Sequence, residues 1–342
     1  MSAQLTEFVA AHRSKLPLLV VTLVALVVPV ILGDFLLFLA ASILAFGLYG
    51  SSFDILFGYT GLLSFGHSVF LGAGAYAAAL AVAEHGQSAF AGFLIAITFA
   101  SALAFVVGLI AIRLKSHGFV ILTILVALSF RLLAETFSSI TGGTDGIIVT
   151  VPPIQLPVVG ELLFIDPVVR YYTTLAVVMV SLFFIYRLVN SPVGLVFQMI
   201  RENEERAKML GHNVMVYKLI SFVVSGLFAG AAGVLVVYIN GFVSSEILSV
   251  LVASEAVIFT ILGGAATIIG PIFGAILIRG AENYISQITN AYPLLVGVIL
   301  LLTILFEPRG IVGIATRVRE RFVGTNGSTN DGVDYSETVD ND

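Results

Sequence analysis

The sequence predicts an all-α, polytopic integral membrane protein with about ten transmembrane segments, some of them re-entrant or broken by glycine. Of its 342 residues, 58% are hydrophobic and 11% charged, and the mean hydropathy is +1.07. These values lie outside the usual range of soluble proteins. No Lys or Arg occurs between Lys15 and Arg113, and Arg279 is the only one between Lys218 and Arg309. A soluble protein would need charge on those surfaces.

The apolar residues form long runs, and a helix needs roughly 20 residues to cross the hydrocarbon core. The expected segments are Leu16–Leu32, Phe35–Phe57, His67–Ala83, Phe90–Ile112, Phe119–Ala134, Val168–Leu188, Leu219–Ile239, Leu248–Leu262, Ile268–Ala281 and Pro293–Phe306. Several are short and rich in glycine, so eight full spans with additional re-entrant pieces is the alternative count. Arg13 and Lys15 precede the first run as in a signal peptide, but the many segments that follow favour an uncleaved first span.

Basic residues favour the cytoplasmic side of a membrane, and their positions give the orientation. The expected segments place the groups near Lys15, Arg113, Arg187–Lys218 and Arg309 on one face. The opposite face receives Glu135–Asp166, which contains acids and no Lys or Arg. We therefore expect residues 1–15 and the chain's end to be cytoplasmic.

The remaining composition excludes several kinds of site. There is no cysteine, and the five histidines are scattered, so neither a disulfide nor a metal site is expected. None of the four lysines follows a glycine, so the chain lacks a phosphate-binding loop. We expect no enzyme activity, no bound cofactor and no nucleic-acid partner.

Five of the 21 acids lie after Asn330 and no base does, so the other 16 acids balance the 16 bases. Residues 312–342 are therefore expected to be a largely disordered, acidic cytoplasmic tail.

Charge is concentrated in one loop, residues 190–218, and above all in "RENEERAKMLG", Arg201–Gly211. Ser191 and Pro192 are typical of a helix start, and Gly211 is typical of a helix end. The apolar residues between them recur at helical spacing, which predicts one or two short amphipathic helices. Such helices either lie on the membrane surface or dock into a soluble partner. If the protein pumps, another chain must hydrolyse the ATP.

Five blocks occur in an order that resembles a known family. They are "GYTGLLSFGHSVFLGAGAYAAAL" (Gly58–Leu80), "TGGTDGI" (Thr141–Ile147), "RENEERAKMLGHNVMVYKLISFVVSGLFAGAAGVL" (Arg201–Leu235), "ILGGAATIIGPIFGAIL" (Ile261–Leu277) and "FEPRGI" (Phe306–Ile311). Together they resemble the M-type permease of branched-chain amino acid importers of the ATP-binding cassette (ABC) class. The resemblance covers most of Gly58–Ile311, and we expect residues 16–311 to form a permease domain in the plasma membrane of a prokaryote. Asp54 and Asp145 depart from the family pattern, which more often has a neutral amide at these positions.

The resemblance implies a heterodimer with a second, related permease, two cytoplasmic ATPases and an extracytoplasmic substrate-binding protein, all around a lipid bilayer. It also implies that the charged loop is the coupling helix that docks into the ATPases. The residues expected to couple are Arg201, Glu202, Asn203, Glu204, Arg206, Ala207, Leu210 and Gly211. We expect Ala207, Leu210 and Gly211 to pack beneath the charged turn. The expected cargo is a branched-chain or related small amino acid; the alternatives are a urea or short-amide permease of the same class and a stand-alone channel or facilitator.

Candidate pathway residues lie in two glycine-rich blocks, because unwound backbone at membrane depth can line a cavity. The candidates are Gly58, Gly61, Ser64, His67, Gly72, Gly74, Glu255, Gly263, Gly264 and Gly270. Close helix packing is the alternative role of the glycines. Arg131 and Glu135 are four residues apart and are expected to neutralise each other. An ionised carboxylate is costly at bilayer depth, so neither Asp54 nor Glu255 should face lipid unpaired.

Overall fold

The computed structural model describes residue 29, residues 32–114, 116–156 and 160–285, and a few isolated residues beyond (294, 297, 298, 301, 310, 311 and 313). The expected segments Leu16–Leu32 and Pro293–Phe306, the N-terminal residues 1–15 and the acidic tail 312–342 lie essentially outside the described residues.

The described chain is mostly helical. Its long helices are α3 (Asp34–Asp54), α4 (Ser68–Ala83), α5 (Ala89–Ala111), α6 (Ser116–Thr136), α8 (Pro167–Val189), α11 (Val214–Asn240), α12 (Val250–Gly263) and α13 (Gly270–Ile285). Shorter elements are the π-helical turn η1 (Ile55–Tyr59), α7 (Ser138–Thr141), α9 (Pro192–Glu202), α10 (Glu204–Met209) and the 3-10 turn η2 (Ser245–Leu248). All eight expected segments inside the described ranges are helices.

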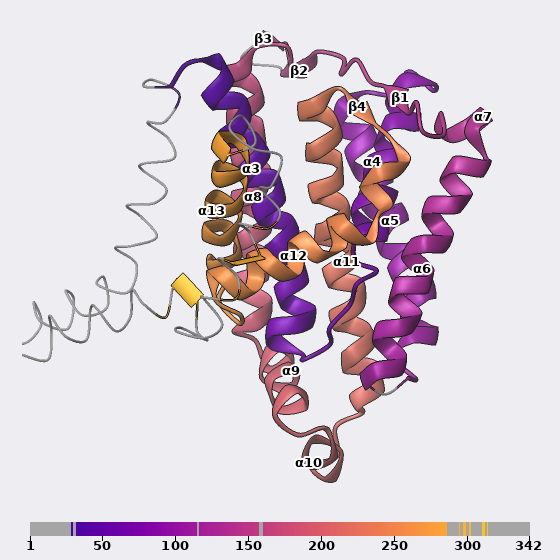
Figure 1. Ribbon diagram of the computed structural model, residues 1–342, viewed down its shortest axis with the longest axis vertical. Coiled ribbons are helices and arrows are strands. Elements are labelled where there is room, and N and C mark those ends of the chain that lie inside the picture. Colours follow the sequence, from indigo (N-terminus) through magenta and orange to yellow (C-terminus); the bar gives the residue numbers. More distant parts are fainter. Residues whose placement is uncertain are drawn as a thin grey trace, which may run out of the picture.

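Two small antiparallel strand pairs depart from the all-α expectation. β1 (Ile147–Ile148) pairs with β4 (Phe242–Val243), and β2 (Ile154–Leu156) pairs with β3 (Gly160–Leu162). The first pair joins the loop after α7 to the chain leaving α11. Both pairs lie at one end of the helix bundle, and α9 and α10 lie at the opposite end (Figure 1).

Five of the described helical stretches are long and apolar enough to cross a membrane: Asp34–Tyr59, Ala89–Ala111, His117–Thr136, Pro167–Val189 and Val214–Asn240. Ser68–Ala83 and Val250–Gly263 are apolar but shorter, in keeping with the expected partial spans. The count of about ten spans is not confirmed by these helices.

Helix α11 lies at the centre of the bundle and packs against α3, α4 and α5. Glycines make this packing close: a Cβ on Gly226 would overlap Ala104 of α5, and one on Gly233 would overlap the carbonyl oxygen of Leu71 in α4. Small residues at such contacts let membrane helices approach each other. Large apolar side chains, among them Ile110 and Leu132, are exposed on the outer faces of α5 and α6. An exposed apolar belt of this kind suits contact with lipid or with other membrane helices.

Candidate functional site

The charged loop folds into two short helices, α9 and α10, which meet at a sharp bend. Ser191 caps α9 by accepting a hydrogen bond from the Gly194 amide at 3.4 Å, and Pro192 is its first residue. Asn203 has extended backbone, which ends α9, and its side chain caps α10 by accepting from the Arg206 amide at 2.9 Å. The expectation of one or two short helices is confirmed as two.

One apolar cluster holds this hairpin to the bundle. Val196 and Ile200 of α9, Ala207 of α10 and Val214 of α11 are all buried together. Ala207 therefore packs beneath the turn as expected, against its own chain.

The expectation for Leu210 is wrong, because its side chain is 64% exposed, and its neighbour Met209 is 82% exposed. Gly211 also does not pack: a Cβ on it would meet nothing within 4 Å. Its φ of +86° instead shows that glycine serves the turn that ends α10.

A small ion network stiffens the hairpin. Glu204 accepts from Lys208 at 3.0 Å and from Lys218 of α11 at 2.6 Å. Burial raises the pKa of the Glu204 carboxyl, but the hydrogen bonds from the two lysines outweigh it and leave that pKa below its ordinary value. Lys218 is buried, so Glu204 also neutralises a charge that has little access to water. Glu202 and Arg206 are exposed and free to meet a partner.

Arg201 connects the hairpin to the end of α3. Its Nη1 donates a hydrogen bond to the carbonyl oxygen of Gly58 in η1. The backbone and side chain of Arg201 also lie 3.2–3.4 Å from where a Cβ on Gly61 would stand, and Gly61 has a φ of +79°. Arg201 thus binds this chain's own backbone, a role that its place in a charged run did not indicate.

The two glycine-rich blocks meet beside this arginine. Asp54, 1% exposed, accepts a hydrogen bond at 2.8 Å from the amide of Ala266, in the loop between α12 and α13. A Cβ on Gly58 would overlap both Asp54 and Ala266, so this contact requires glycine. The meeting point contacts α9, so Gly58 and Gly61 lie at the α9–α10 end of the bundle rather than at mid-depth. Asp54 does not face lipid, and that prediction is confirmed.

Residues 60–67 are not helical, as the glycine-broken block predicted, but their polar side chains are buried. Ser64 accepts a hydrogen bond from the Gly66 amide at 3.3 Å. His67 is fully buried; its ring stacks on Tyr49, with centroids 5.3 Å apart, and its Nε2 lies 2.9 Å from the hydroxyl oxygen of Ser52. Ser52 donates its proton to the Tyr49 carbonyl oxygen at 2.6 Å. The ring proton is therefore assigned to Nε2, which is satisfied, whereas the buried Nδ1 has no hydrogen-bond partner among the described residues.

The remaining candidate glycines serve close contacts or the chain break. Inside α4, a Cβ on Gly72 would overlap the Leu248 side chain, and one on Gly74 would overlap the carbonyl oxygen of Gly230. A Cβ on Gly263 would overlap the carbonyl oxygen of Gly270, where α12 ends and α13 begins. Gly264, between them, has a φ of +115°. These glycines therefore make close contacts or allow the chain break, and their place in a pathway stays a prediction.

Glu255 of α12 is held in an ion cluster with α13. Its Oε2 accepts from Arg279 Nη2 at 2.7 Å, and Arg279 Nη1 donates to Glu282 at 3.0 Å. The guanidinium also lies 3.8 Å above the centre of the Phe46 ring of α3. Glu255 is therefore paired, as predicted, and the cluster ties α3, α12 and α13 together.

A cavity of about 770 Å³ lies between α4, α5 and α6. Its walls are almost entirely apolar, and they include Ala73 and Tyr76 of α4, Phe99 of α5 and Phe130 of α6. None of the ten candidate pathway residues lines it. Its aliphatic and aromatic walls look in the sequence like any membrane helix, so no sequence signal could have found it.

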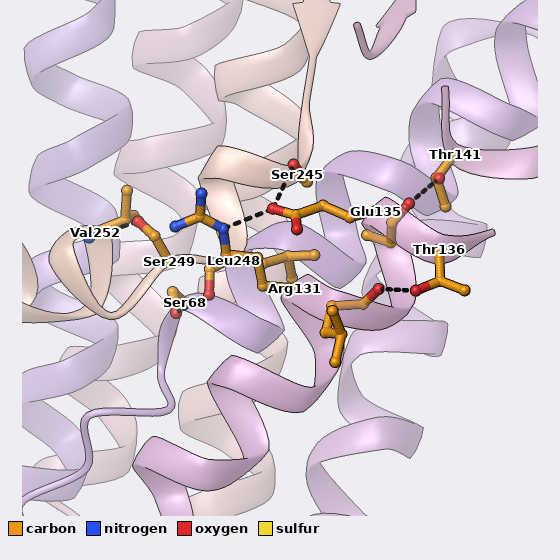
Figure 2. Close-up of polar contacts among 11 residues, drawn as sticks. Ser68, Arg131, Glu135, Thr136, Thr141, Ser245, Leu248, Ser249 and Val252 are labelled. Carbon is orange, nitrogen blue, oxygen red and sulfur yellow. Dashed lines mark hydrogen bonds and ion pairs between the residues drawn. The ribbon is translucent and has the colours of Figure 1, made fainter. Parts of the chain in front are cut away.

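On the neighbouring face of α6, Arg131 and Glu135 form the expected pair, with Nε 2.9 Å from Oε1. Ser245 of η2 donates to the same carboxylate oxygen at 3.4 Å. Figure 2 shows Glu135 between Arg131 and Ser245, so the carboxylate bridges two elements that are far apart in the sequence. Ser245 was not anticipated, because nothing in the sequence places η2 beside α6.

Comparison with known proteins agrees with this architecture. A family model described as "Branched-chain amino acid transport system / permease component" matches residues 35–306. The chain is 27% identical over 323 residues to the "High-affinity branched-chain amino acid transport system permease protein LivM" of Escherichia coli (strain K12), covering 88% of this chain and 75% of that protein. It is 26% identical, with the same coverage, to the protein of that name from Salmonella typhimurium. No solved structure matches the chain significantly.

The match to the family model covers most of the chain, and the apolar helices described above lie within it. The chain is therefore a multi-pass membrane protein that belongs to the permease-component family of branched-chain amino acid transport systems.

Proposed function

We propose that this chain is the transmembrane permease subunit of an ABC importer and forms part of the pathway for branched-chain or related small amino acids. ATP is hydrolysed by two partner subunits, and this chain itself binds no cofactor. The other partners are a second, related permease and an extracytoplasmic binding protein, in the plasma membrane of a prokaryote, with both termini cytoplasmic. The family and the names of the relatives support the transport role and the class of cargo.

The observation that carries the proposal is the surface of the α9–α10 hairpin. Met209 and Leu210 are large, apolar and mostly exposed, and Glu202 and Arg206 are exposed around them. An apolar tip with a charged rim is typical of a protein-docking surface. Because the hairpin lies at the end of the bundle, its occupant is expected to be a soluble domain (Figure 1). Because this chain lacks a phosphate-binding loop, ATP must be hydrolysed by another chain. A soluble ATPase is therefore the partner that we infer for this surface.

The test compares two substitutions at one position in the complex co-expressed with its proposed partners. Gly211→Leu adds bulk next to the apolar tip and strains a left-handed residue, whereas Gly211→Asn fits that backbone conformation better. A Cβ atom at position 211 would have no other atom of this chain within 4 Å, so both variants should insert into the membrane and fold. We expect Gly211→Leu to abolish substrate-stimulated ATP hydrolysis, and Gly211→Asn to retain much of it.

Glu205→Ala is the control, because Glu205 is exposed and has no ion-pair partner among the described side chains. It should change ATP hydrolysis little, since one exposed charge is commonly worth under about 1 kcal/mol. Normal uptake by Gly211→Leu with normal ATPase assembly would show that the hairpin is only a surface loop. Uptake of urea or short amides in place of leucine, isoleucine and valine would reassign the cargo. Uptake without any ATPase would identify a stand-alone facilitator.

A further inference from the structure

We propose that Arg131 and Glu135 of α6 form a recognition site for the α-ammonium and α-carboxylate groups of a zwitterionic amino acid. This inference rests on the proposed function and assigns its substrate contacts to residues that are not among the glycine-rich candidates. It stands on the position of the pair, on its unused hydrogen-bonding groups and on its net charge.

The pair lies in the last turns of α6, an apolar helix that is long enough to cross a membrane. Arg131 lies five residues before the end of α6 at Thr136, about 7.5 Å along the helix axis. The two side chains are 41% and 31% exposed, so protein does not enclose them. Ionisable side chains inside a membrane segment face water, a cavity or another protein rather than lipid. Arg131 and Glu135 therefore indicate a polar environment beside the outer part of α6, at the end of the bundle opposite α9 and α10.

The pair also has unused capacity. In the described part of the chain, Arg131 uses only Nε, and its two Nη groups have no hydrogen-bond partner. Glu135 accepts from Arg131 and Ser245 through Oε1, and no other described residue occupies Oε2. The planar Nη end of an arginine matches a carboxylate with two parallel hydrogen bonds, and a free carboxylate oxygen accepts from an ammonium group.

The contrast with the Arg279 cluster supports a binding role. Arg279 uses Nη1 and Nη2 on two carboxylates and stacks on Phe46, and its side chain is 19% exposed. That arginine is occupied by the protein, as expected for a structural ion cluster. Among the described residues, Arg131 is held through Nε alone, and its side chain is 41% exposed.

The net charge of the pair selects the ligand class. One guanidinium and one carboxylate sum to zero, so a ligand that carries both charges binds without leaving either protein charge uncompensated. A ligand that lacks its carboxylate or its ammonium would leave one side unpaired, which is costly away from bulk water. The geometry therefore favours an amino acid over its amide, over the corresponding carboxylic acid and over urea.

Ser245 connects this site to the rest of the fold. It leads through η2 to Ser249, which caps α12 by accepting from the Val252 amide at 3.3 Å. Ser68, at the start of α4, donates to the Leu248 carbonyl oxygen at 3.1 Å. Figure 2 shows these residues near the pair, so Glu135 is anchored to the segment that leads into α12, and that segment is hydrogen-bonded to the first residue of α4.

The test is direct binding of radiolabelled leucine to the complex in nanodiscs, without any soluble binding protein, by scintillation proximity. We expect saturable binding that leucine competes for and that leucinamide and 4-methylpentanoate compete for poorly. Arg131→Gln should weaken binding at least about ten-fold, because charged hydrogen bonds are lost. Arg131→Lys should fall between, since it keeps the charge but not the planar fork. Glu282→Gln, in the occupied cluster, is the matched control and should leave binding unchanged.

A double variant, Arg131→Glu with Glu135→Arg, separates binding from structure. If the pair only stabilises α6, the exchanged pair should restore both the thermal stability and the leucine binding that the single variants lose. If it recognises substrate, thermal stability should return while leucine binding stays weak, because the ligand's charges now face like charges. Restored binding, or Arg131→Gln binding as tightly as the wild type, would overturn the inference. If binding contradicts the inference but cells with the wild-type complex still take up leucine, the proposed function stands. If those cells take up no amino acid, the inference and the proposed function are both overturned.

Discussion

Gly58→Ala is expected to destabilise the protein strongly, although it adds only one methyl group. The new Cβ would overlap Asp54 Oδ1 and the Ala266 amide nitrogen, the two atoms that form the buried 2.8 Å hydrogen bond. Losing a hydrogen bond to a carboxylate costs about 1.5–3 kcal/mol. Forcing a methyl group into a filled space costs about 1–3 kcal/mol more. The free energy of unfolding should therefore fall by roughly 2.5–6 kcal/mol.

The assay is thermal unfolding of the purified chain in detergent, followed by circular dichroism because the chain has no tryptophan. Gly280→Ala is the control, since a Cβ there meets nothing within 4 Å and alanine favours a helix. We expect a clearly lower unfolding temperature for Gly58→Ala and an equal or slightly higher one for Gly280→Ala. Equal stability of the two variants would show that the contact of Gly58 with Asp54 and Ala266 is not tight.

Three further predictions concern other parts of the chain. Asp54→Asn should keep or raise thermal stability, because an amide oxygen can accept from Ala266 without burying a charge, whereas Asp54→Ala should lower it by about 1–3 kcal/mol. Because folding lowers the pKa of Glu204, its pairs with the two lysines stabilise the protein above about pH 4.5. This stabilisation is lost as the pH falls through the pKa of Glu204 in the folded protein, and Glu204→Gln should remove the pH dependence from unfolding curves. Single cysteines at Thr144 and Asn203, exposed at opposite ends of the bundle, should react with impermeant reagents from opposite sides, and labelling from one side would contradict the orientation.

The helices could be predicted because hydropathy is a local property of the sequence. All eight expected segments within the described ranges are helical, and the break between η1 and α4 falls where Gly61 and Gly66 stand. The Arg131–Glu135 pair could be predicted for the same reason, since residues four apart share one helix face. Local spacing is enough for such features.

What the sequence could not provide is the pairing of distant segments. Arg201 looks like one more surface charge until the fold places Gly58 beside it, 143 positions earlier in the chain. Asp54 and Ala266 are similarly remote, and no periodic pattern connects them. The glycines were interpreted as pathway residues because a helix break and a close contact require the same residue type. Only the tertiary structure shows which of these glycines make close contacts.

The bond from Arg201 to Gly58 gives the hairpin a mechanical consequence. Helix α9 has 11 residues and is about 16 Å long, so it can act as a stiff rod. One end of that rod carries the exposed tip at α10, and near the same end Arg201 holds η1. Through Asp54, η1 in turn holds the loop between α12 and α13. A push on the tip would therefore reach two interruptions of regular α-helix, the π-helical turn η1 and the loop between α12 and α13. The bundle can then respond by turning whole helices about these two breaks, with each helix itself left unbent.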